Sequence, residues 1–175
     1  MAPGTPVEVW FHDAMRVGQK GTLTRVWAET GSRPSAPRSD GYQAVYLFGA
    51  VCPGQDRGGA LILPRCDTAA MTLFLDELSN HVAPGAHAIL VLDGAGWHTA
   101  KDLRWPGQVT PLPACSPELN PQERAWEFLR QPHLALRRVL DHTARLDACQ
   151  DAWRRFIGAP GRLRSLCSYS WATVS

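Results

Sequence analysis

The sequence predicts a single mixed α/β domain, and three observations support this prediction. Strand-like segments come first along the chain and helix-like segments follow. Residues 87–93 (HAILVLD) contain an unbroken apolar run, which is typical of a parallel strand covered on both faces. The 175 residues, 45% of them hydrophobic, can bury one sizeable core. We therefore expect one layered domain over residues 1–175.

Four segments in the first part of the chain have strand character. Residues 7–13 are separated from residues 22–29 by a Lys-Gly turn, and a loop rich in Gly, Ser, Pro and Arg follows. Residues 42–51 are rich in aromatic and β-branched side chains, as expected of a central strand, and a short strand covers 60–64. We expect these segments to form a meander that supplies three antiparallel strands of the sheet.

The hydrophobic period changes after these strands and predicts a helix over residues 67–82. Its apolar side chains recur at helical spacing behind Asp67, which is a favourable N-cap residue. This helix should pack on the sheet. The strand at 87–93 comes next, and a short helix is expected at 99–103.

The last part of the chain predicts one strand and two helices. Residues 108–113 have strand character, but Pro111 cannot donate a ladder hydrogen bond, which favours an edge position. A helix begins at Asn120, with Pro121 at its first position, and ends before the next proline. A final amphipathic helix covers residues 143–157. The whole pattern is that of three antiparallel strands and two parallel strands with helices.

Composition excludes several classes of protein. No segment is long and apolar enough to cross a membrane, and the first residues lack a signal-peptide pattern, so we expect a soluble, cytoplasmic protein with no membrane partner. The five cysteines are odd in number and widely spaced, which argues against a disulfide framework or a CxxC zinc site. We expect free thiols, mostly buried.

Charge is distributed unevenly along the chain. Residues 1–120 carry nine Lys or Arg against eleven Asp or Glu, whereas residues 121–175 carry nine against five. A basic C-terminal part can face a polyanion such as DNA, and scattered arginines also occur as solvated helix faces. Charge alone leaves both interpretations open.

Asp93 is the first candidate for a functional side chain. It ends the buried strand at 87–93, and in open α/β sheets the ligand crevice lies beyond the carboxyl ends of the strands. An acid in that position, with glycines beside it, can bind a hard cation. The alternative is a turn acid that accepts backbone hydrogen bonds. A nucleotide-binding loop is disfavoured because GAGWHT lacks the third glycine.

Two further acids could share a site with Asp93. Asp13 also ends a strand with apolar residues, and it too could be a turn acid. Glu123 follows Asn120 at the spacing of a capping box, which by itself explains a glutamate there. Three carboxylates on two strand ends and one helix are nevertheless the set that can hold two Mg²⁺ ions.

Four stretches of the chain carry a family resemblance: WFHDAMRVGQKG, YLFGAV, LVLDGAGWH and, above all, LPACSPELNPQERAWEFL. They resemble the catalytic domain of bacterial insertion-sequence transposases of the mariner superfamily, a DDE-type domain with a ribonuclease H-like fold. The resemblance covers nearly the whole chain. It implies that the acidic triad is Asp13, Asp93 and Glu123.

The chain also departs from the family pattern. Ala14 stands where a second acid usually follows the first aspartate, and Ala114 and Cys115 replace a proline-tyrosine pair. The stretch QPHLALRRVL lacks an expected asparagine-tyrosine pattern. The family's N-terminal helix-turn-helix region is expected to be absent, which leaves the source of DNA recognition open.

The resemblance implies phosphoryl transfer on DNA with two Mg²⁺ or Mn²⁺ ions. One ion, between Asp13 and Asp93, would activate water or a DNA 3′-hydroxyl, and the second, between Asp13 and Glu123, would stabilise the leaving oxygen. His98 would contact a phosphate or orient an acid, or else hydrogen-bond at a helix start. Trp97, Trp126 and Trp153 are expected in the core.

The implied partner is double-stranded DNA, as element ends and as target. Candidates for phosphate contacts, which could equally be solvated helix faces, are Arg124, Arg130, Arg137, Arg138, Arg154 and Arg155. A homodimer on DNA and a separately encoded helix-turn-helix partner are also expected. Two alternatives remain open: a stand-alone metal-dependent nuclease of the same fold, and an inactive DNA-binding remnant.

Overall fold

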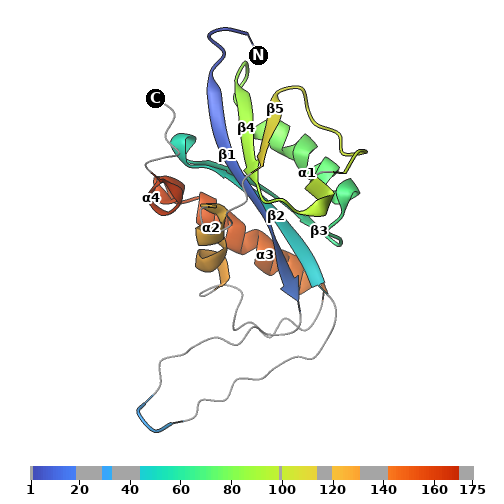
Figure 1. The fold of residues 1–175 in the computed structure, drawn as a ribbon. Coiled ribbons are helices and arrows are strands. Elements are labelled where there is room, and N and C mark those ends of the chain that lie inside the picture. Colours follow the sequence, from blue (N-terminus) through green and yellow to red (C-terminus); the bar gives the residue numbers. More distant parts are fainter. Residues whose placement is uncertain are drawn as a thin grey trace.

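The computed structural model describes residues 2–18, 29–32, 44–98, 100–113, 120–130 and 142–169. Within them lies a five-stranded sheet of order β3-β2-β1-β4-β5 (Figure 1). The strands are β1 (Val7–Gly18), β2 (Ala44–Cys52), β3 (Arg57–Leu63), β4 (His87–Leu92) and β5 (Val109–Pro113). The first three pair antiparallel, whereas β4 pairs in parallel with both β1 and β5. The predicted mixed sheet is confirmed.

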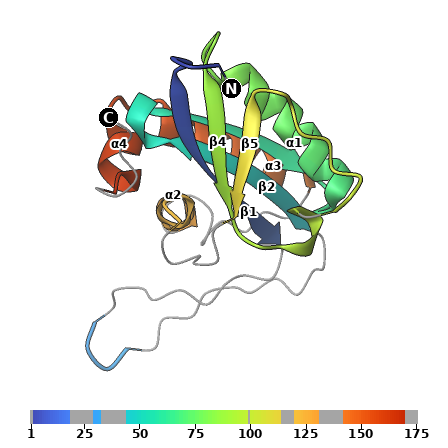
Figure 2. The same ribbon diagram turned by 45° about the horizontal axis from the view of Figure 1, so that its top comes forward.

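Helices cover both faces of the sheet (Figures 1 and 2). The helix α1 (Thr68–His81) packs with Trp10, Phe48 and Leu90 in one core cluster. The other face carries α2 (Gln122–Leu129), α3 (His142–Ile157) and α4 (Arg162–Cys167), which pack in a second cluster with residues such as Phe11 and Val91. Successive strand residues thus belong to different cores, as the alternation of side chains across a strand requires.

Several predicted elements are confirmed. Asp67 caps α1 because its Oδ1 accepts the N–H of Ala70 at 2.9 Å. β5 lies at the edge of the sheet, where Pro111 costs no ladder bond. The last predicted helix, 143–157, corresponds to α3.

Other elements differ from the prediction. β1 runs five residues beyond Asp13, because Ala14 to Gly18 keep pairing with β2. The short helix expected at 99–103 is wrong. A 3-10 turn, η2 (Gly96–His98), comes before it, and Leu103 N–H closes a single turn on Ala100 O. One turn fixes too much backbone for the hydrogen bonds it gains. The strand predicted at 22–29 falls outside the described residues except for Glu29, which is not in a strand.

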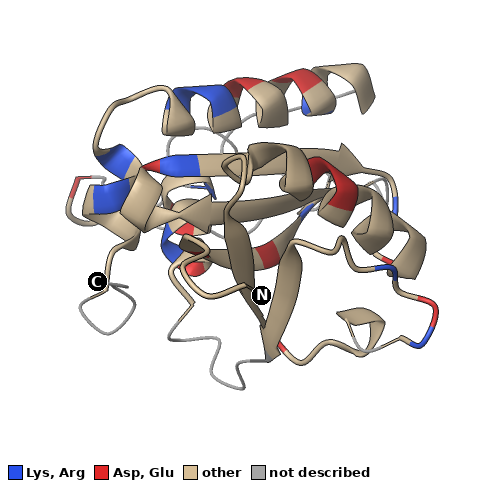
Figure 3. Ribbon diagram, turned by 90° about the horizontal axis from the view of Figure 1, so that it is seen from above, with Lys and Arg blue, Asp and Glu red and all other residues tan. Residues whose placement is uncertain are grey.

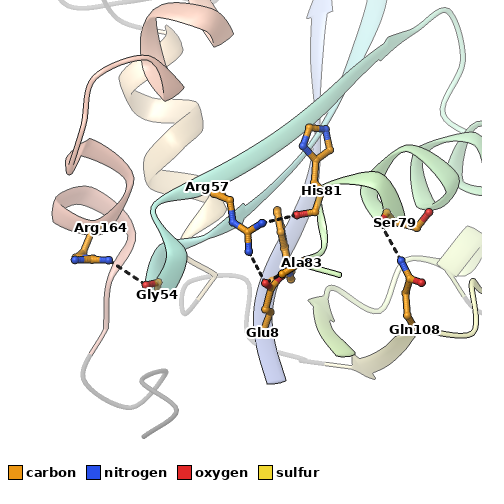
Figure 4. A network of polar contacts seen from close by, with 9 residues as sticks. Glu8, Gly54, Arg57, Ser79, His81, Ala83, Gln108 and Arg164 are labelled. Atoms are coloured by element: carbon orange, nitrogen blue, oxygen red, sulfur yellow. Dashed lines mark hydrogen bonds and ion pairs between the residues drawn. The ribbon is translucent and has the colours of Figure 1, made fainter. Parts of the chain in front are cut away.

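A polar network anchors the N-terminal end of β1 (Figure 4). The Glu8 carboxylate, only 4% exposed, accepts from Trp10 Nε1 at 2.9 Å, from Ala83 N at 3.3 Å and from the Arg57 guanidinium. Arg57 also donates to His81 O at 3.0 Å. The 3-10 turn η1 (Pro53–Gln55), between β2 and β3, is held by Arg164, which donates to Gly54 O at 3.1 Å.

The described cysteines are free thiols, as expected. Cys52, Cys149 and Cys167 are buried, and burial raises the pKa of each thiol to between about 11 and about 12. Cys66 is half-buried, and Cys115 lies outside the described residues. In the described part of the chain, no helix has the length and apolar character needed to span a membrane.

Candidate active site

Asp13 and Asp93 lie at matching positions on neighbouring parallel strands. The last residue pair between β1 and β4 joins Phe11 to Val91, and each aspartate comes two residues later. Because side chains alternate across a strand, Asp13 shares the face of Phe11, which belongs to the core cluster under α2. The Asp13 carboxylate therefore faces the helix that carries Glu123. Asp93 lies directly after the end of β4, close enough for its charge to act on Asp13.

Two hydrogen bonds fix the start of α2 against β1. Asn120 Nδ2 donates to His12 O at 2.8 Å, and Trp126 Nε1 donates to Asp13 Oδ2 at 2.7 Å. Asn120 Oδ1 also accepts the N–H of Gln122 at 3.1 Å, but α2 begins at Gln122 with Pro121 as its N-cap residue, so the helix starts later than the predicted Asn120. Pro121 has helical angles, φ −58° and ψ −22°. Glu123 thereby enters the first turn of α2 beside Asp13.

Gly49 lets α2 approach the sheet this closely. It lies opposite Asp13 on β2, and a Cβ there would stand 2.5 Å from a ring atom of Trp126 and 2.8 Å from Gln122 Nε2. Sequence reasoning missed this residue. A glycine inside an aromatic and β-branched strand is the signal that could have found it, because such a glycine often marks a close approach of another element.

The electrostatics of Asp13 reflect this crowding. The pKa of Asp13 is raised to about 6, chiefly by burial and in smaller part by the nearby charges of Glu123 and Asp93. Hydrogen bonds from the Ala14 N–H and from Trp126 act in the opposite direction on this pKa. Glu123 and Asp93 are thus close enough to influence Asp13, and a cation beside them would favour the charged form of Asp13.

His98 lies behind Asp93. Its Nδ1 is 2.9 Å from both the backbone oxygen and the Oδ1 of Asp93. Burial lowers the pKa of His98, although Asp93 opposes the shift. Both Asp93 oxygens can only accept, so His98 Nδ1 is the donor in this contact. The role expected for His98, in orienting an acid or contacting a phosphate, stays a prediction.

His12 is a second buried histidine, which sequence reasoning missed. It is 0% exposed, and its ring stacks on Phe74 with centroids 4.5 Å apart. Its Nδ1 is 2.9 Å from Gly49 O. Burial lowers the pKa of His12 to about 3, and the neighbouring His98 lowers it as well. As the residue before Asp13, it points to the opposite face of the sheet, under α1.

The three acids are suited to hard divalent cations, which prefer carboxylate oxygens. Among the described residues, no three Asp, Glu, His or Cys side chains are gathered closely enough to hold an ion as they stand. One oxygen of Asp13 is directed at the Trp126 N–H. Carboxylates without a bound cation repel one another, which favours such a spread. The donor set and the raised pKa of Asp13 fit a cation site.

The four candidate DNA-binding arginines that the structure describes are exposed at two helices. Arg124 lies on α2 and Arg130 directly after it, and Arg154 and Arg155 lie near the end of α3. Arg137 and Arg138 lie outside the described residues. Arg124 links α2 to α4, because it donates to Leu166 O at 3.2 Å and covers the Tyr169 ring at 4.4 Å. Figure 3 shows basic and acidic segments interspersed along the helices.

The tryptophans occupy the cores, as predicted. Trp126 and Trp153 are buried with ring centroids 6.0 Å apart, and Trp97 is half-buried against the α1 side. Ala14 also packs on the α1 side, away from Asp13. A second acid at this position would therefore not face Glu123.

Comparisons with solved structures support the fold. The Mos1 mariner paired-end complex with Mn has a TM-score of 0.63 and 16% identity, and the match covers 90% of this chain and 50% of that one. The Mos1 strand transfer complex has a TM-score of 0.58 and 17% identity, with 93% and 55% covered. The chain thus spans about half the length of these structures.

Sequence comparisons show the family. An uncharacterized protein, y4pE/y4sA of Sinorhizobium fredii (strain NBRC 101917 / NGR234), is 43% identical over 130 residues, which cover 73% of this chain and 96% of that protein. The family model described as DDE superfamily endonuclease matches residues 8–146, a span that holds all three acids. The chain therefore belongs to the DDE superfamily endonucleases.

Proposed function

We propose that this chain is the catalytic domain of an insertion-sequence transposase, which cuts DNA strands and joins the freed 3′ ends to target DNA. The observation that carries the proposal is the juxtaposition of Asp13 and Asp93 on parallel strands with Glu123 on α2, close enough for the acids to alter the pKa of Asp13. These three residues would hold two Mg²⁺ or Mn²⁺ ions. Bound there, the ions would supply an activated nucleophilic oxygen and a stabilised leaving oxygen.

The remaining residues prepare the acids for that task. Trp126 donates to Asp13 and limits its rotation, while Asn120 ties the first turn of α2 to the backbone of β1. His98 donates to Asp93 and fixes its carboxylate from behind. Asp13 would be deprotonated when a cation is present, because a nearby positive charge favours the carboxylate.

The substrate would be double-stranded DNA, both element ends and target. Exposed Arg124, Arg130, Arg154 and Arg155 supply phosphate contacts in this proposal, which are insensitive to sequence and weakened by salt. A homodimer on DNA, a helix-turn-helix module encoded separately and action in the cytoplasm belong to the same proposal. The resemblance in fold to DNA-bound Mos1 complexes supports it.

The position of Ala14 bears on whether this copy is active. An inactive remnant was one interpretation of its missing second acid. Because residue 14 packs on the α1 side of the sheet, opposite Asp13, the alanine removes no carboxylate from the candidate site. All three acids of the site remain, which favours an active enzyme.

The test is an assay with supercoiled plasmid and a labelled duplex that ends in a free 3′-hydroxyl, in Mn²⁺ or in EDTA. Covalent joining of the label to the plasmid in Mn²⁺ alone would support a transposase. Nicking without joining would indicate a stand-alone nuclease. An inert chain that still binds the duplex would indicate a remnant. A chain with Asp13 replaced by Asn serves as control for contaminating nucleases.

A further inference from the structure

Two buried nitrogen atoms next to the candidate site are unexplained by the mechanism above. The Nε2 atoms of His12 and His98 are inaccessible to solvent, and neither has a hydrogen-bond partner in the described part of the chain. The two rings meet edge to face, with centroids 5.5 Å apart. A buried polar atom without a partner destabilises the fold, so a pair of them calls for a shared explanation.

The tautomers follow from the other nitrogen of each ring. His12 Nδ1 faces Gly49 O, and His98 Nδ1 faces the oxygens of Asp93. Since an oxygen of this kind can only accept, each Nδ1 carries the hydrogen. Both rings are also buried, which disfavours a charged imidazole, so each Nε2 is left as a hydrogen-bond acceptor. Two acceptors cannot bond to each other, but one donor with two hydrogens can satisfy both.

We propose that one buried water donates to both Nε2 atoms, and that through it His12 is a positioning residue for His98 and hence for Asp93. Buried waters typically occupy such places, between polar groups that the protein itself leaves unpaired. The chain of contacts would run from Gly49 O through His12, the water and His98 to Asp93. His12 would thus act from the α1 face of the sheet on an acid beyond the end of β4.

The water link would hold the Asp93 carboxylate in place through His98. Groups that orient a ligand residue commonly change metal affinity or activity by about 10- to 100-fold when removed. The packing around His12 is already apolar and close, with Phe74 and Phe48 on its ring. A phenylalanine would pack there as well, so the nitrogens rather than the ring shape call for a histidine. The effect on Asp93 rests on the function proposed above, whereas the link between the two histidines does not.

Two substitutions separate the nitrogens of His12. In His12→Asn the amide reaches the place of Nδ1 and keeps the bond to Gly49 O but leaves nothing at Nε2. In His12→Gln the longer side chain brings an acceptor to the place of Nε2 and gives up Nδ1. Both variants lose the ring and its stacking on Phe74, so they are matched controls for packing.

The direct readout is the ¹⁵N resonance of His98 Nε2 in the metal-free full chain, with labelled histidine and EDTA. The wild type should show an unprotonated, hydrogen-bonded Nε2. His12→Asn should move this resonance to that of an unbonded nitrogen, and His12→Gln should move it much less. An unbonded signal in the wild type, or equal signals in both variants, would overturn the inference. The wild-type spectrum decides even if neither variant folds. If the wild type shows a hydrogen-bonded signal before EDTA is added and EDTA abolishes that signal, the partner is a metal ion, which would also overturn the inference.

The functional readout is the Mn²⁺ dependence of DNA cleavage. We expect His12→Asn to raise the Mn²⁺ concentration for half-maximal cleavage about tenfold, and His12→Gln to retain more of the wild-type response. An inactive wild type would refute the proposed function and leave the spectroscopic test intact. If the wild type is active and both variants show the same Mn²⁺ response as the wild type, the positioning role alone would be refuted.

Discussion

Buried acids at the two ends of β1 lie in opposite electrostatic environments. Glu8, near the start, is surrounded by donors, namely the Arg57 guanidinium, the Trp10 indole and the Ala83 N–H (Figure 4). Asp13, five residues later, accepts hydrogen bonds from the Trp126 indole and the Ala14 N–H, but its charged neighbours are two other acids. A carboxylate whose charge is balanced by the protein stabilises the fold. One whose charge is left uncompensated is suited to bind a cation, and such groups occur preferentially at functional sites.

The largest expected effect comes from Asp93→Asn. The change is nearly isosteric and removes one ligand charge, so metal-dependent cleavage should fall by about 10³-fold or more. The thermal stability of the metal-free chain should stay the same or rise slightly, because repulsion with Asp13 is relieved. Cleavage kinetics and a melting curve in EDTA measure the two effects. If the variant lost much stability but retained cleavage, Asp93 would have a structural role, like Glu8, and would not be a metal ligand.

Glu123→Gln tests whether the third acid is a ligand or only a capping residue. Glutamine can still serve a helix N-terminus, so we expect the fold to persist while cleavage falls by about 10²-fold or more. Glu127→Gln, at an exposed position one turn along α2, is the matched control and should cleave normally. If Glu123→Gln retained full activity and Glu127→Gln lost it, Glu127 would be the third ligand.

The fold could be predicted from the sequence where local patterns determine it. The apolar run of β4, the Pro111 edge strand and the Asp67 cap are each specified by a few neighbouring residues. The extension of β1 to Gly18 could not, because it depends on pairing with β2. The helix α4 was also missed, since six residues are too few for a periodic signal and its anchor, Asp56, is over a hundred residues away.

The candidate site divides in the same way. The three acids were predicted from their positions and from a family resemblance, and their roles as ligands stay a prediction. The contacts that support them were not predictable, although Gly49 within its strand signals that some element approaches closely. The Asn120 bond to His12 O and the clearance over Gly49 each join segments distant in sequence. His12 precedes a predicted acid, yet nothing local shows that its ring is buried beside His98.

Glu8→Gln provides the reverse test at the other end of β1. It removes the charge that faces Arg57 and places an amide donor where only donors surround it, so we expect a loss of stability. A fully buried pair would cost about 3–5 kcal/mol when broken, and the exposure of Arg57 should reduce this to about 2 kcal/mol. The Arg57 side chain is 39% exposed. Chemical denaturation measures the loss.

The same variant should cleave DNA normally at a temperature where it remains folded. Glu77→Gln, on the exposed side of α1 and paired with His81, is a suitable control for loss of a surface charge and should lose far less stability. Cleavage by Glu8→Gln that fell as far as that of Asp93→Asn would remove the contrast between the two ends of β1.

The smallest expected effect concerns Asp56, a solvent-accessible acid with a structural role. Its oxygens accept the N–H groups of Gly161 and Arg164 and so cap α4 from a distant turn. Desolvation raises the pKa of Asp56, but these hydrogen bonds and the Arg164 charge outweigh it and lower the pKa below its usual value. A lowered folded-state pKa contributes stability above the unfolded-state pKa, and this contribution is lost as the pH falls through the folded-state value.

The substitution Asp56→Asn suits the positive φ of 51° at this position. After allowance for solvent screening, it should cost about 1 kcal/mol of stability, or about 2–4 °C in Tm, at neutral pH. The difference in Tm from the wild type should shrink as the pH is lowered below about 4, whereas Asp151→Asn, an exposed acid on α3, should show no such trend. A Tm difference for Asp56→Asn that is independent of pH would mean that α4 is held by shape rather than by the charge of its cap.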